Sequence, residues 1–319
     1  MLESFLFSAN TIIPILLVTV LGGLLKKFKF LDDNFFSQSE KFVFKVALPA
    51  MLFIEISTAD GAEIFDGAFI GFCVVGIIVS FIIPCLIVPL IIKQNDKRGA
   101  FIQGVYRSNF AILGVTLADN MFGDEGVQQI AMVLPFAIVL FNFFAVTILS
   151  IFGPAEKKLS PMQLVKVLAK NIFTNPLIIS VVLALPFLLF EISLPKFINT
   201  SLVYLKNSTM PLSLLALGAS FSFDSLKSRF GLAISATVCK TVVLPAIMLA
   251  AAILLGYRGP QLGVVLILFG GPAAVSSYIM AKNMESDYEL AGQILLFTTL
   301  LCTFTLFGAI FLLKYFALI

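Results

Sequence analysis

Two short stretches of this chain place polar or helix-breaking residues inside long apolar runs. One reads RSN at 107–109, and the other reads GGP at 270–272. Pro272 removes a backbone donor and clashes with the preceding turn, and the two glycines weaken a helix, so we expect this run to form two half-helices. The run around Asn109 contains no proline there, but its polar residues at the corresponding place predict a second break.

Breaks of this kind create places where an ion can bind. Unpaired N–H groups at the N-terminus of a half-helix can hold an anion, and unpaired carbonyl groups at a C-terminus can hold a cation. Asn109 offers a donor and an acceptor, either to a carboxylate or to the freed backbone. Ser276 and Ser277 follow Pro272 and place hydroxyls near the expected N-terminus, unless each bonds back to its own helix. A proline kink without a ligand is the alternative interpretation.

Two basic residues lie at or near the expected breaks, deep inside apolar runs. Arg107 could bind a carboxylate in a two-pronged geometry, or it could reach back to the membrane surface. Lys240 lies well inside the run SATVCKTVVLPA, where a charged side chain is costly and indicates function by default. It could be a counter-charge for an anion, a proton carrier or a substitute for a bound sodium ion. It could also pair structurally with a carboxylate or with a helix C-terminus.

The remaining polar residues of the apolar runs suggest structural or interfacial roles. Glu55 lies near the outer end of its run, and Asp119 and Lys282 fall at the ends of theirs, where solvent is near. The hydroxyl of Tyr278 belongs with those of the neighbouring serines. The predicted substrate-binding residues are therefore Arg107, Asn109, Lys240, Pro272, Ser276 and Ser277.

The elements that carry these residues must be membrane helices. Of the 319 residues, 60% are hydrophobic and only 12% are charged, and the mean hydropathy is +1.06. A soluble protein of this length would need far more polar surface, whereas a bilayer span takes about 20 apolar residues. We therefore predict an all-α polytopic membrane protein with ten spans, at roughly 8–28, 41–59, 67–92, 99–119, 127–152, 171–190, 201–222, 229–255, 259–281 and 288–317.

Composition also excludes several classes of function. The chain has no His, so a histidine-based metal or catalytic site is impossible, and we expect no cofactor and no metal. Its four Cys residues all fall in apolar runs and are expected to be small core hydrophobes. No basic stripe predicts nucleic-acid binding, and no GxxxxGK[ST] phosphate loop predicts a primary pump.

The distribution of Lys and Arg predicts the orientation. Most of them lie in the loops after spans 1, 3, 5, 7 and 9 or at the flanking span ends, among them Lys26, Lys27 and Arg98. Because positive residues favour the cytoplasmic side, we expect the segment 153–170 in the cytoplasm and both termini outside the cell. The expected location is the inner (plasma) membrane, with multiple passes.

Landmarks recur in the two halves of the chain at a nearly constant spacing. ADNMFGD at 118–124 and AKNMESD at 281–287 lie 163 residues apart, and Asn109 falls opposite Pro272. Shared Leu, Ile and Ala could produce single apolar matches, but not ordered landmarks. Five spans per copy is an odd number, so the second copy must enter the bilayer from the opposite side, as in many secondary transporters. We predict inverted repeats at 1–152 and 171–319, joined by a linker at 153–170, with broken helices 4 and 9 crossing.

The ordered motifs resemble the auxin efflux carrier family over essentially the full chain. They are ALPAMLF, RSNFAILG, NPLIIS, MPLSLLALGASF and GPAAVSSYIMAKNM. The resemblance implies a five-plus-five fold shared with bile acid symporters and sodium/proton antiporters. Helices 1, 2, 6 and 7 would form a scaffold, expected to be a homodimer, and helices 3–5 and 8–10 a domain that moves like an elevator. The chain departs from the plant exporters in its short linker and in Asn109, where those proteins have a proline.

These observations favour a secondary transporter of a small organic anion, an auxin- or malate-like carboxylate, with a proton or sodium ion as an open coupling partner. The alternative within the class is a cation/proton antiporter or a sodium-coupled symporter of the same fold, but no Asp or Glu lies mid-span near either break. An enzyme would have to use a Ser–Lys arrangement of Ser276 and Lys240, and we expect none. A receptor or a channel is the remaining alternative class.

Overall fold

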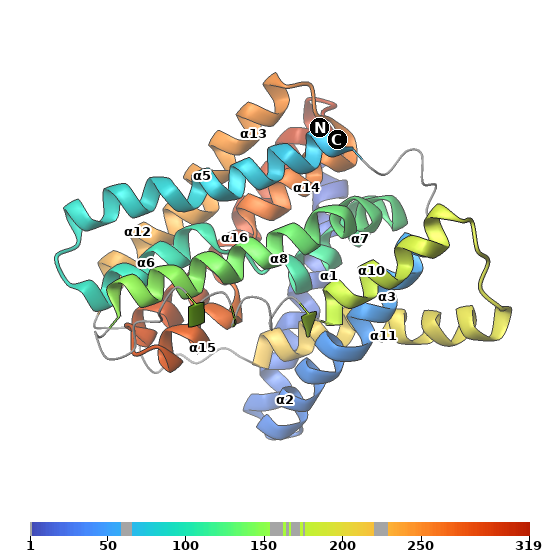
Figure 1. Cartoon of the computed structure of the whole chain (residues 1–319), viewed down its shortest axis with the longest axis horizontal. Coiled ribbons are helices and arrows are strands. Elements are labelled where there is room, and N and C mark those ends of the chain that lie inside the picture. Colours follow the sequence, from blue (N-terminus) through green and yellow to red (C-terminus); the bar gives the residue numbers. More distant parts are fainter. Residues whose placement is uncertain are drawn as a thin grey trace.

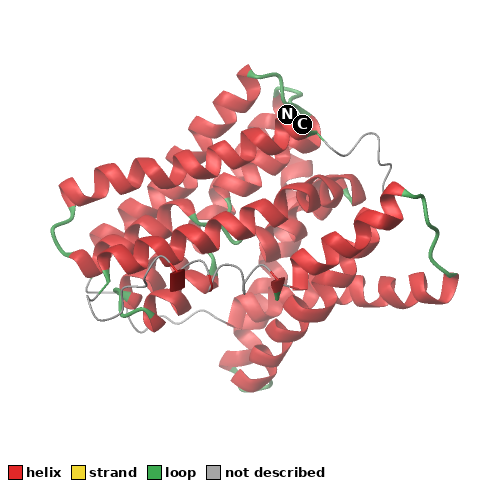
Figure 2. Cartoon of the chain, viewed as in Figure 1, coloured by secondary structure: helices red, strands yellow, loops and turns green. Residues whose placement is uncertain are grey.

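The computed structural model describes residues 2–58, 66–153, 162–163, 166, 173–174, 176–219 and 229–319, and nearly all of them are helical (Figure 2). The predicted linker at 153–170 lies almost entirely outside these ranges. In the first part of the chain the helices are α1 (Leu2–Lys27), α2 (Asp33–Phe42), the π-helical turn η1 (Val43–Ala47), α3 (Leu48–Ser57), α5 (Gly67–Ile91), α6 (Asn95–Tyr106), the π-helical turn η2 (Phe110–Gly114), α7 (Val115–Phe122) and α8 (Asp124–Phe152).

The second part of the chain also contains long, short and interrupted helices. Its helices are α10 (Pro176–Leu189), α11 (Lys196–Ala219), α12 (Phe230–Val238), the π-helical turn η4 (Cys239–Val243), α13 (Leu244–Leu254), α14 (Gly259–Gly270), α15 (Val275–Asn283) and α16 (Tyr288–Tyr315). Among the described residues, five continuous helices are long and apolar enough to cross a bilayer, namely Leu2–Lys27, Gly67–Ile91, Asp124–Phe152, Phe230–Leu254 and Tyr288–Tyr315. Shorter, interrupted or less apolar helices occupy the other predicted spans.

The second span begins earlier than its apolar pattern predicts. The helix starts at Asp33, where the Asp32 side chain accepts a hydrogen bond from the Phe35 amide at 2.8 Å, and it runs without a gap to Ser57. Lys41 therefore lies inside the helix rather than before it. The π-helical turn η1 ends two residues before Pro49, and η4 stands in the same relation to Pro245. A widened turn makes room for a proline ring that would otherwise clash with the turn before it.

Two groups of helices are visible on either side of α1 (Figure 1). Helices α2, α3, α10 and α11 lie on one side, and α5, α6, α8 and α12 to α16 lie on the other. Helix α1 packs most extensively on α11, and their backbones touch: a Cβ on Gly22 would meet the Leu215 carbonyl oxygen at 2.1 Å, and one on Gly218 the Thr19 carbonyl oxygen at 1.7 Å. Only glycine allows so close a crossing.

Both predicted breaks are present, and the two broken segments pair with each other. Helix α6 ends at Tyr106, and η2 begins at Phe110; helix α14 ends at Gly270, and α15 begins at Val275. Ser108 forms an antiparallel bridge with Ala273, and the Asn109 amide donates to the Pro272 carbonyl oxygen at 2.8 Å. The two interruptions therefore satisfy part of each other's backbone. We call this pairing the crossing.

Side chains from outside the two broken segments complete the crossing. The hydroxyl of Thr298, on α16, accepts a hydrogen bond from the Ala273 amide at 3.1 Å and donates to the Leu295 carbonyl oxygen. Gly271 is required because a Cβ there would meet the Ile267 carbonyl oxygen at 2.7 Å and the Ser108 hydroxyl at 2.8 Å. The crossing thus depends on one glycine and one threonine that lie far apart in the sequence.

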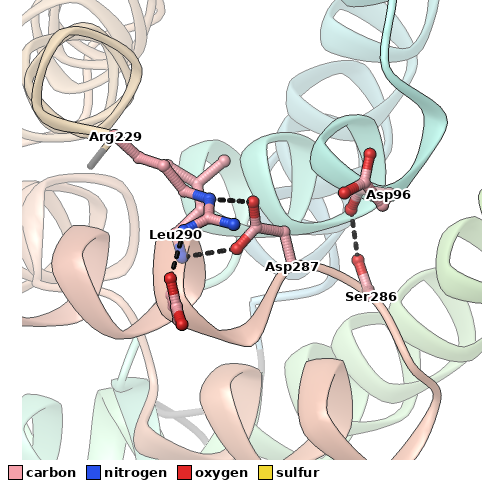
Figure 3. Close-up of polar contacts among 6 residues, drawn as sticks. Asp96, Arg229, Ser286, Asp287 and Leu290 are labelled. Atoms are coloured by element: carbon pink, nitrogen blue, oxygen red, sulfur yellow. Dashed lines mark hydrogen bonds and ion pairs between the residues drawn. The ribbon is translucent and has the colours of Figure 1, made fainter. Parts of the chain in front are cut away.

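The chain ends lie together at one end of the molecule, which we call the terminal end (Figure 1). The Lys314 ammonium lies 4.6 Å from the centre of the Phe7 ring, and Gln261 donates to the Asp66 carboxylate at 3.0 Å. At the opposite end, which we call the far end, Arg229 binds Asp287 and Glu289, and the Ser286 hydroxyl donates to the Asp96 carbonyl oxygen at 2.7 Å (Figure 3). These contacts tie the start of α12 and the start of α6 to the start of α16 and the residue pair just before it.

Replacing Gly218 by alanine should force α1 and α11 apart. We expect a loss of about 1–3 kcal/mol, because the added methyl group overlaps a backbone oxygen that cannot rotate away. The thermal unfolding midpoint of the purified protein in detergent measures this loss. Gly308→Ala is the control, because nothing lies within 4 Å of a Cβ at Gly308, and it should leave the midpoint unchanged or raise it. Equal effects of the two substitutions would contradict the close approach of α1 and α11.

Replacing Thr298 by valine should destabilise the crossing while keeping the shape of the side chain. The Ala273 amide would lose its acceptor, and a buried unsatisfied donor costs about 1–3 kcal/mol. Thr299→Val is the matched control, since the Thr299 hydroxyl bonds only to the Leu295 carbonyl oxygen of its own helix. Thermal unfolding of both variants tests this, and a Thr299→Val variant as unstable as Thr298→Val would refute the assignment.

Candidate functional site

Arg107 is buried directly at the end of α6, with 5% of its surface exposed. Its guanidinium donates to the Gln103 Oε1 and the Asn142 Oδ1, each at 2.9 Å, and contacts the Met280 Sδ at 2.9 Å. All three partners are neutral. Within the described ranges no carboxylate pairs with Arg107, so its positive charge stays uncompensated. The alternative in which Arg107 reaches the membrane surface is wrong for this structure.

Gln103 and Asn142 are site residues that the sequence analysis missed. Gln103 is fully buried one helical turn before Arg107, and its amide donates to the Ser277 carbonyl oxygen at 3.4 Å. Asn142 reaches Arg107 from the middle of α8. Gln103 and Asn142 each place an amide inside a helix. Gln103 stands four residues before Arg107, which places Gln103 and Arg107 on one helix face. That spacing was the available signal for Gln103.

Lys240 is fully buried in η4, and its ammonium donates to the Tyr106 carbonyl oxygen at 3.4 Å. Tyr106 is the last residue of α6, so Lys240 lies at a helix C-terminus, where a cation is favourable. Of the two structural pairings expected for Lys240, the one with a helix C-terminus is present. The other, with a carboxylate, is absent from the described part of the chain. Because Arg107 follows Tyr106 directly, both buried cations are positioned by the end of α6, Lys240 at its last carbonyl and Arg107 as the next residue.

Polar groups without partners surround the crossing. The hydroxyls of Ser108 and Ser277 are buried and have no hydrogen-bond partner among the described residues. Asn109 uses its backbone in the crossing, whereas its side-chain amide makes no hydrogen bond within the described ranges. Helix α15 begins after Ala274, which cannot cap it with a side chain. Buried polar groups are normally paired, so these groups have capacity to bind a ligand or water.

The predicted residues therefore separate into those that the fold brings together and those that it does not. Arg107, Asn109, Pro272 and Ser277 meet at the crossing, and Lys240 lies at the end of α6 beside it. Ser276 follows on α15 and is half-buried.

The other polar candidates lie apart from the crossing. The Tyr278 ring packs against Tyr288, at 6.2 Å between centroids, and the Lys282 ammonium lies over the same Tyr288 ring. Asp119 is half-buried on α7, and the side chain of Glu55 falls outside the described residues. The four cysteines are unpaired, and Cys73 and Cys302 are buried, as expected of small core residues. Groups of three or more metal-binding side chains are absent from the described ranges.

The arrangement can bind an anion but offers little to a cation. Two buried positive charges, an uncapped helix N-terminus and free amide and hydroxyl donors converge on a region without a neighbouring carboxylate. Arginine and asparagine donors match the oxygens of a carboxylate. In a medium of low dielectric constant such uncompensated charges are costly, and a bound anion would remove that cost.

Comparison with known proteins gives consistent matches along the whole chain. An uncharacterized transporter of Methanocaldococcus jannaschii is 27% identical over 298 residues, which cover 91% of this chain and 94% of the relative. An uncharacterized transporter of Methanothermobacter thermautotrophicus is 22% identical over 299 residues, which cover 93% of this chain and 95% of that protein. A protein of Rhizobium meliloti whose name proposes malonate transport is 25% identical over 281 residues, covering 86% of this chain and 85% of its own length.

The family comparison agrees with these relatives and with the helical, apolar fold. The model of a family described as membrane transport protein matches residues 7–310, which is nearly the whole chain. The resemblance to the auxin efflux carriers is thereby confirmed. With its paired helix breaks and its buried cations, this chain belongs to the membrane transport protein family of auxin efflux carriers.

Proposed function

We propose that this protein is a secondary transporter that moves a small organic anion by alternating access. The observation that carries the proposal is the pair of buried cations, Arg107 and Lys240, at the end of α6, where neither has a carboxylate partner among the described residues. A carboxylate substrate would bind the guanidinium, the Asn109 amide and the free hydroxyls of the crossing. Charge compensation would make its binding favourable at that depth.

The symmetry of the crossing supports inverted repeats. Asn109 and Pro272, which occupy equivalent positions 163 residues apart, contact each other directly. The bridge between Ser108 and Ala273 flanks this contact. Self-contact of equivalent positions is what a two-fold axis through the crossing produces.

A second pair of equivalent residues supports opposite orientation of the two copies. Arg98 donates to the Ile92 and Pro89 carbonyl oxygens after α5, and Arg258 donates to the Ile253 and Tyr257 carbonyl oxygens after α13. Each arginine thus satisfies free carbonyls at a helix C-terminus. The start of α5 lies beside the end of α13, where the Phe69 and Tyr257 rings are 5.2 Å apart. The two arginines therefore lie at opposite ends of these helices.

The grouping of helices supports a movement of one group against the other. The most extensive contacts between separate helices are α1 with α11 and α3 with α10, and each pair is the repeat equivalent of the other. They would form the scaffold, and α5 to α8 with α12 to α16 would form the moving domain that carries the crossing. We further propose that the termini face the outside, so that the far end is cytoplasmic, and that the scaffold forms a homodimer.

Replacing Arg107 by glutamine should weaken substrate binding. Malonate is the first probe, because the name of the Rhizobium meliloti relative proposes it as substrate. A charge-assisted hydrogen bond contributes about 1.5–3 kcal/mol, so we expect the half-saturating malonate concentration in proteoliposome counterflow to rise about tenfold or more. Lys240→Gln should also raise the half-saturating malonate concentration, because it removes a positive charge beside the site.

Controls separate loss of binding from loss of folding. Lys282→Gln removes an exposed positive charge that lies away from the crossing and should leave the malonate concentration dependence unchanged. Thermal unfolding in detergent identifies variants that no longer fold. If well-folded Arg107→Gln and Lys240→Gln both exchange malonate and other carboxylates with unchanged affinity, the two cations do not form the anion site. Flux that stays linear with concentration would indicate a channel instead.

Two polar contacts join the proposed scaffold to the proposed moving domain. Lys206 on α11 forms an ion pair with Asp124 at the start of α8, at 2.9 Å, and the Asn120 amide donates to the Thr11 carbonyl oxygen at 3.2 Å. Because α7 ends and α8 begins beside Gly263 of α14, Asp124 lies toward the terminal end. Both contacts would have to break when the domain moves, so they favour the arrangement in this structure.

Replacing Asp124 by asparagine should speed malonate exchange. The Asp124 side chain is largely exposed, so the ion pair contributes at most about 1 kcal/mol, and the counterflow rate should rise no more than about fivefold. High salt should reproduce the effect in the wild type by screening. Glu125→Gln is the control, because Glu125 pairs with no described residue. An unchanged or slower rate in Asp124→Asn alone would show that the ion pair does not limit the movement.

A further inference from the structure

A cavity of about 610 Å³ lies between the two groups of helices, away from the residues that bind Arg107. Helices α1 and α11 form one wall, and η2, α7 and α16 form the other. Most of its lining is apolar, for example Ile15, Val20, Leu113, Leu217 and Leu306. Acidic side chains are absent from its described lining. Arg107, Asn109 and Lys240, which belong to the proposed anion site, are not among its lining residues either.

Two lysines mark one end of this cavity. Lys26 and Lys27 are the last residues of α1 and lie at the far end of the molecule. Lys26 donates to the Ala219 carbonyl oxygen at 3.0 Å and pairs with Asp33. Lys27 is exposed and forms no ion pair or hydrogen bond with another described residue. The end of the cavity thus carries at least one positive charge that is free to bind an anion.

The length of the cavity matches one leaflet of a bilayer. Its lining on α1 extends from Ile15 to Lys27, which is about 18 Å of helix. One leaflet of the hydrocarbon core is about 15 Å thick. Leu16, Val20 and Leu24 line the cavity and are nevertheless 39–49% exposed, so it is open along this apolar side of α1. A molecule with a long apolar chain could therefore enter from the lipid.

One polar atom inside the cavity has no partner. The hydroxyl of Thr19 is buried without a hydrogen bond to any described residue, although Thr19 lines the cavity and is only 9% exposed. Thr299 and Thr303, which face it from α16, bond to carbonyl oxygens of their own helix. A hydroxyl in a membrane helix normally does the same, so the free Thr19 oxygen indicates a ligand atom that can donate or accept there.

We propose that this cavity binds an anionic phospholipid, with an acyl chain along α1 and the phosphate at Lys26 and Lys27. An ester or hydroxyl group of the lipid would meet Thr19. Basic pockets between membrane helices hold anionic headgroups, and the apolar lining suits an acyl chain but not a small, fully hydrated anion. The binding site itself does not depend on the transport proposal. If the helix groups do move, a lipid that contacts both would hold them in the present arrangement.

The test measures lipid binding to the purified full-length chain by native mass spectrometry in detergent. The probes are dioleoyl phosphatidylglycerol, dioleoyl phosphatidylcholine and soluble glycerol 3-phosphate. We expect phosphatidylglycerol to bind at least about fivefold more tightly than phosphatidylcholine, because each lysine near the surface favours an anionic headgroup by about that factor. Glycerol 3-phosphate alone should bind far more weakly than the lipid.

Three variants locate the lipid. Lys27→Gln should weaken phosphatidylglycerol binding about fivefold and leave phosphatidylcholine unchanged. Lys29→Gln is the matched control, because Lys29 is exposed at the same end but does not line the cavity, and it should bind like the wild type. Thr303→Phe should fill the cavity and weaken both lipids, with the thermal midpoint in lipid-free detergent showing that the variant folds.

Several results would overturn the proposal. Equal affinity for the two lipids would remove the headgroup assignment, and equal losses in Lys27→Gln and Lys29→Gln would indicate nonspecific surface charge. Tight binding of glycerol 3-phosphate would exclude the acyl chain. Displacement of the lipid by malonate would assign the cavity to the transported substrate. The other results do not bear on whether Arg107 binds a carboxylate, which the counterflow measurements on Arg107→Gln test separately.

Discussion

The structure depends on one requirement, that backbone N–H and C=O groups inside an apolar protein be paired. Both broken helices free such groups at their ends, and no water is available to them in the hydrocarbon region. The two breaks meet this requirement by pairing with each other, through Asn109 and Pro272, and with the Thr298 hydroxyl. The same requirement explains Lys240, whose ammonium lies at the free carbonyl of Tyr106. Each break therefore supplies partners for part of the backbone that the other leaves free.

This pairing leaves the centre of the molecule positively charged. Arg107 is held by two neutral amide oxygens, and Lys240 by a backbone carbonyl, so the surroundings orient both cations without neutralising them. A buried charge without a counterion is a cost to stability, and proteins keep such charges where function needs them. The polar groups that remain free at Ser108, Asn109 and Ser277 lie around the same point. The proposed anion binding would thus rely on charges that are a cost to stability in the same small region.

The backbone of the crossing is symmetric, whereas its chemistry is not. In the proposed repeats, the equivalent residues Asn109 and Pro272 contact each other at the crossing. Each repeat contributes one cation without a counterpart, since Gly270 stands opposite Arg107 of the first repeat and Ile77 opposite Lys240 of the second. Two copies of a unit can supply a frame that is stable in two related arrangements. Different substitutions in the two copies can then supply a single binding site without disturbing the frame.

The sequence by itself determined the class of the protein, the approximate positions of most of its helices and the place of both breaks, because hydropathy and Pro272 act locally along the chain. It identified Arg107 and Lys240 as unusual for the same reason. It could not identify Asn142 or Thr298 as partners, because an isolated amide or hydroxyl in an apolar helix has no local pattern. For Gln103 the spacing from Arg107 indicates a shared helix face, but not the hydrogen bond itself. Nor could it predict that Lys240 lies at the Tyr106 carbonyl or that Gly218 touches the Thr19 backbone. Those contacts join residues more than 100 positions apart, and only the packing of the helices in three dimensions decides which of them meet.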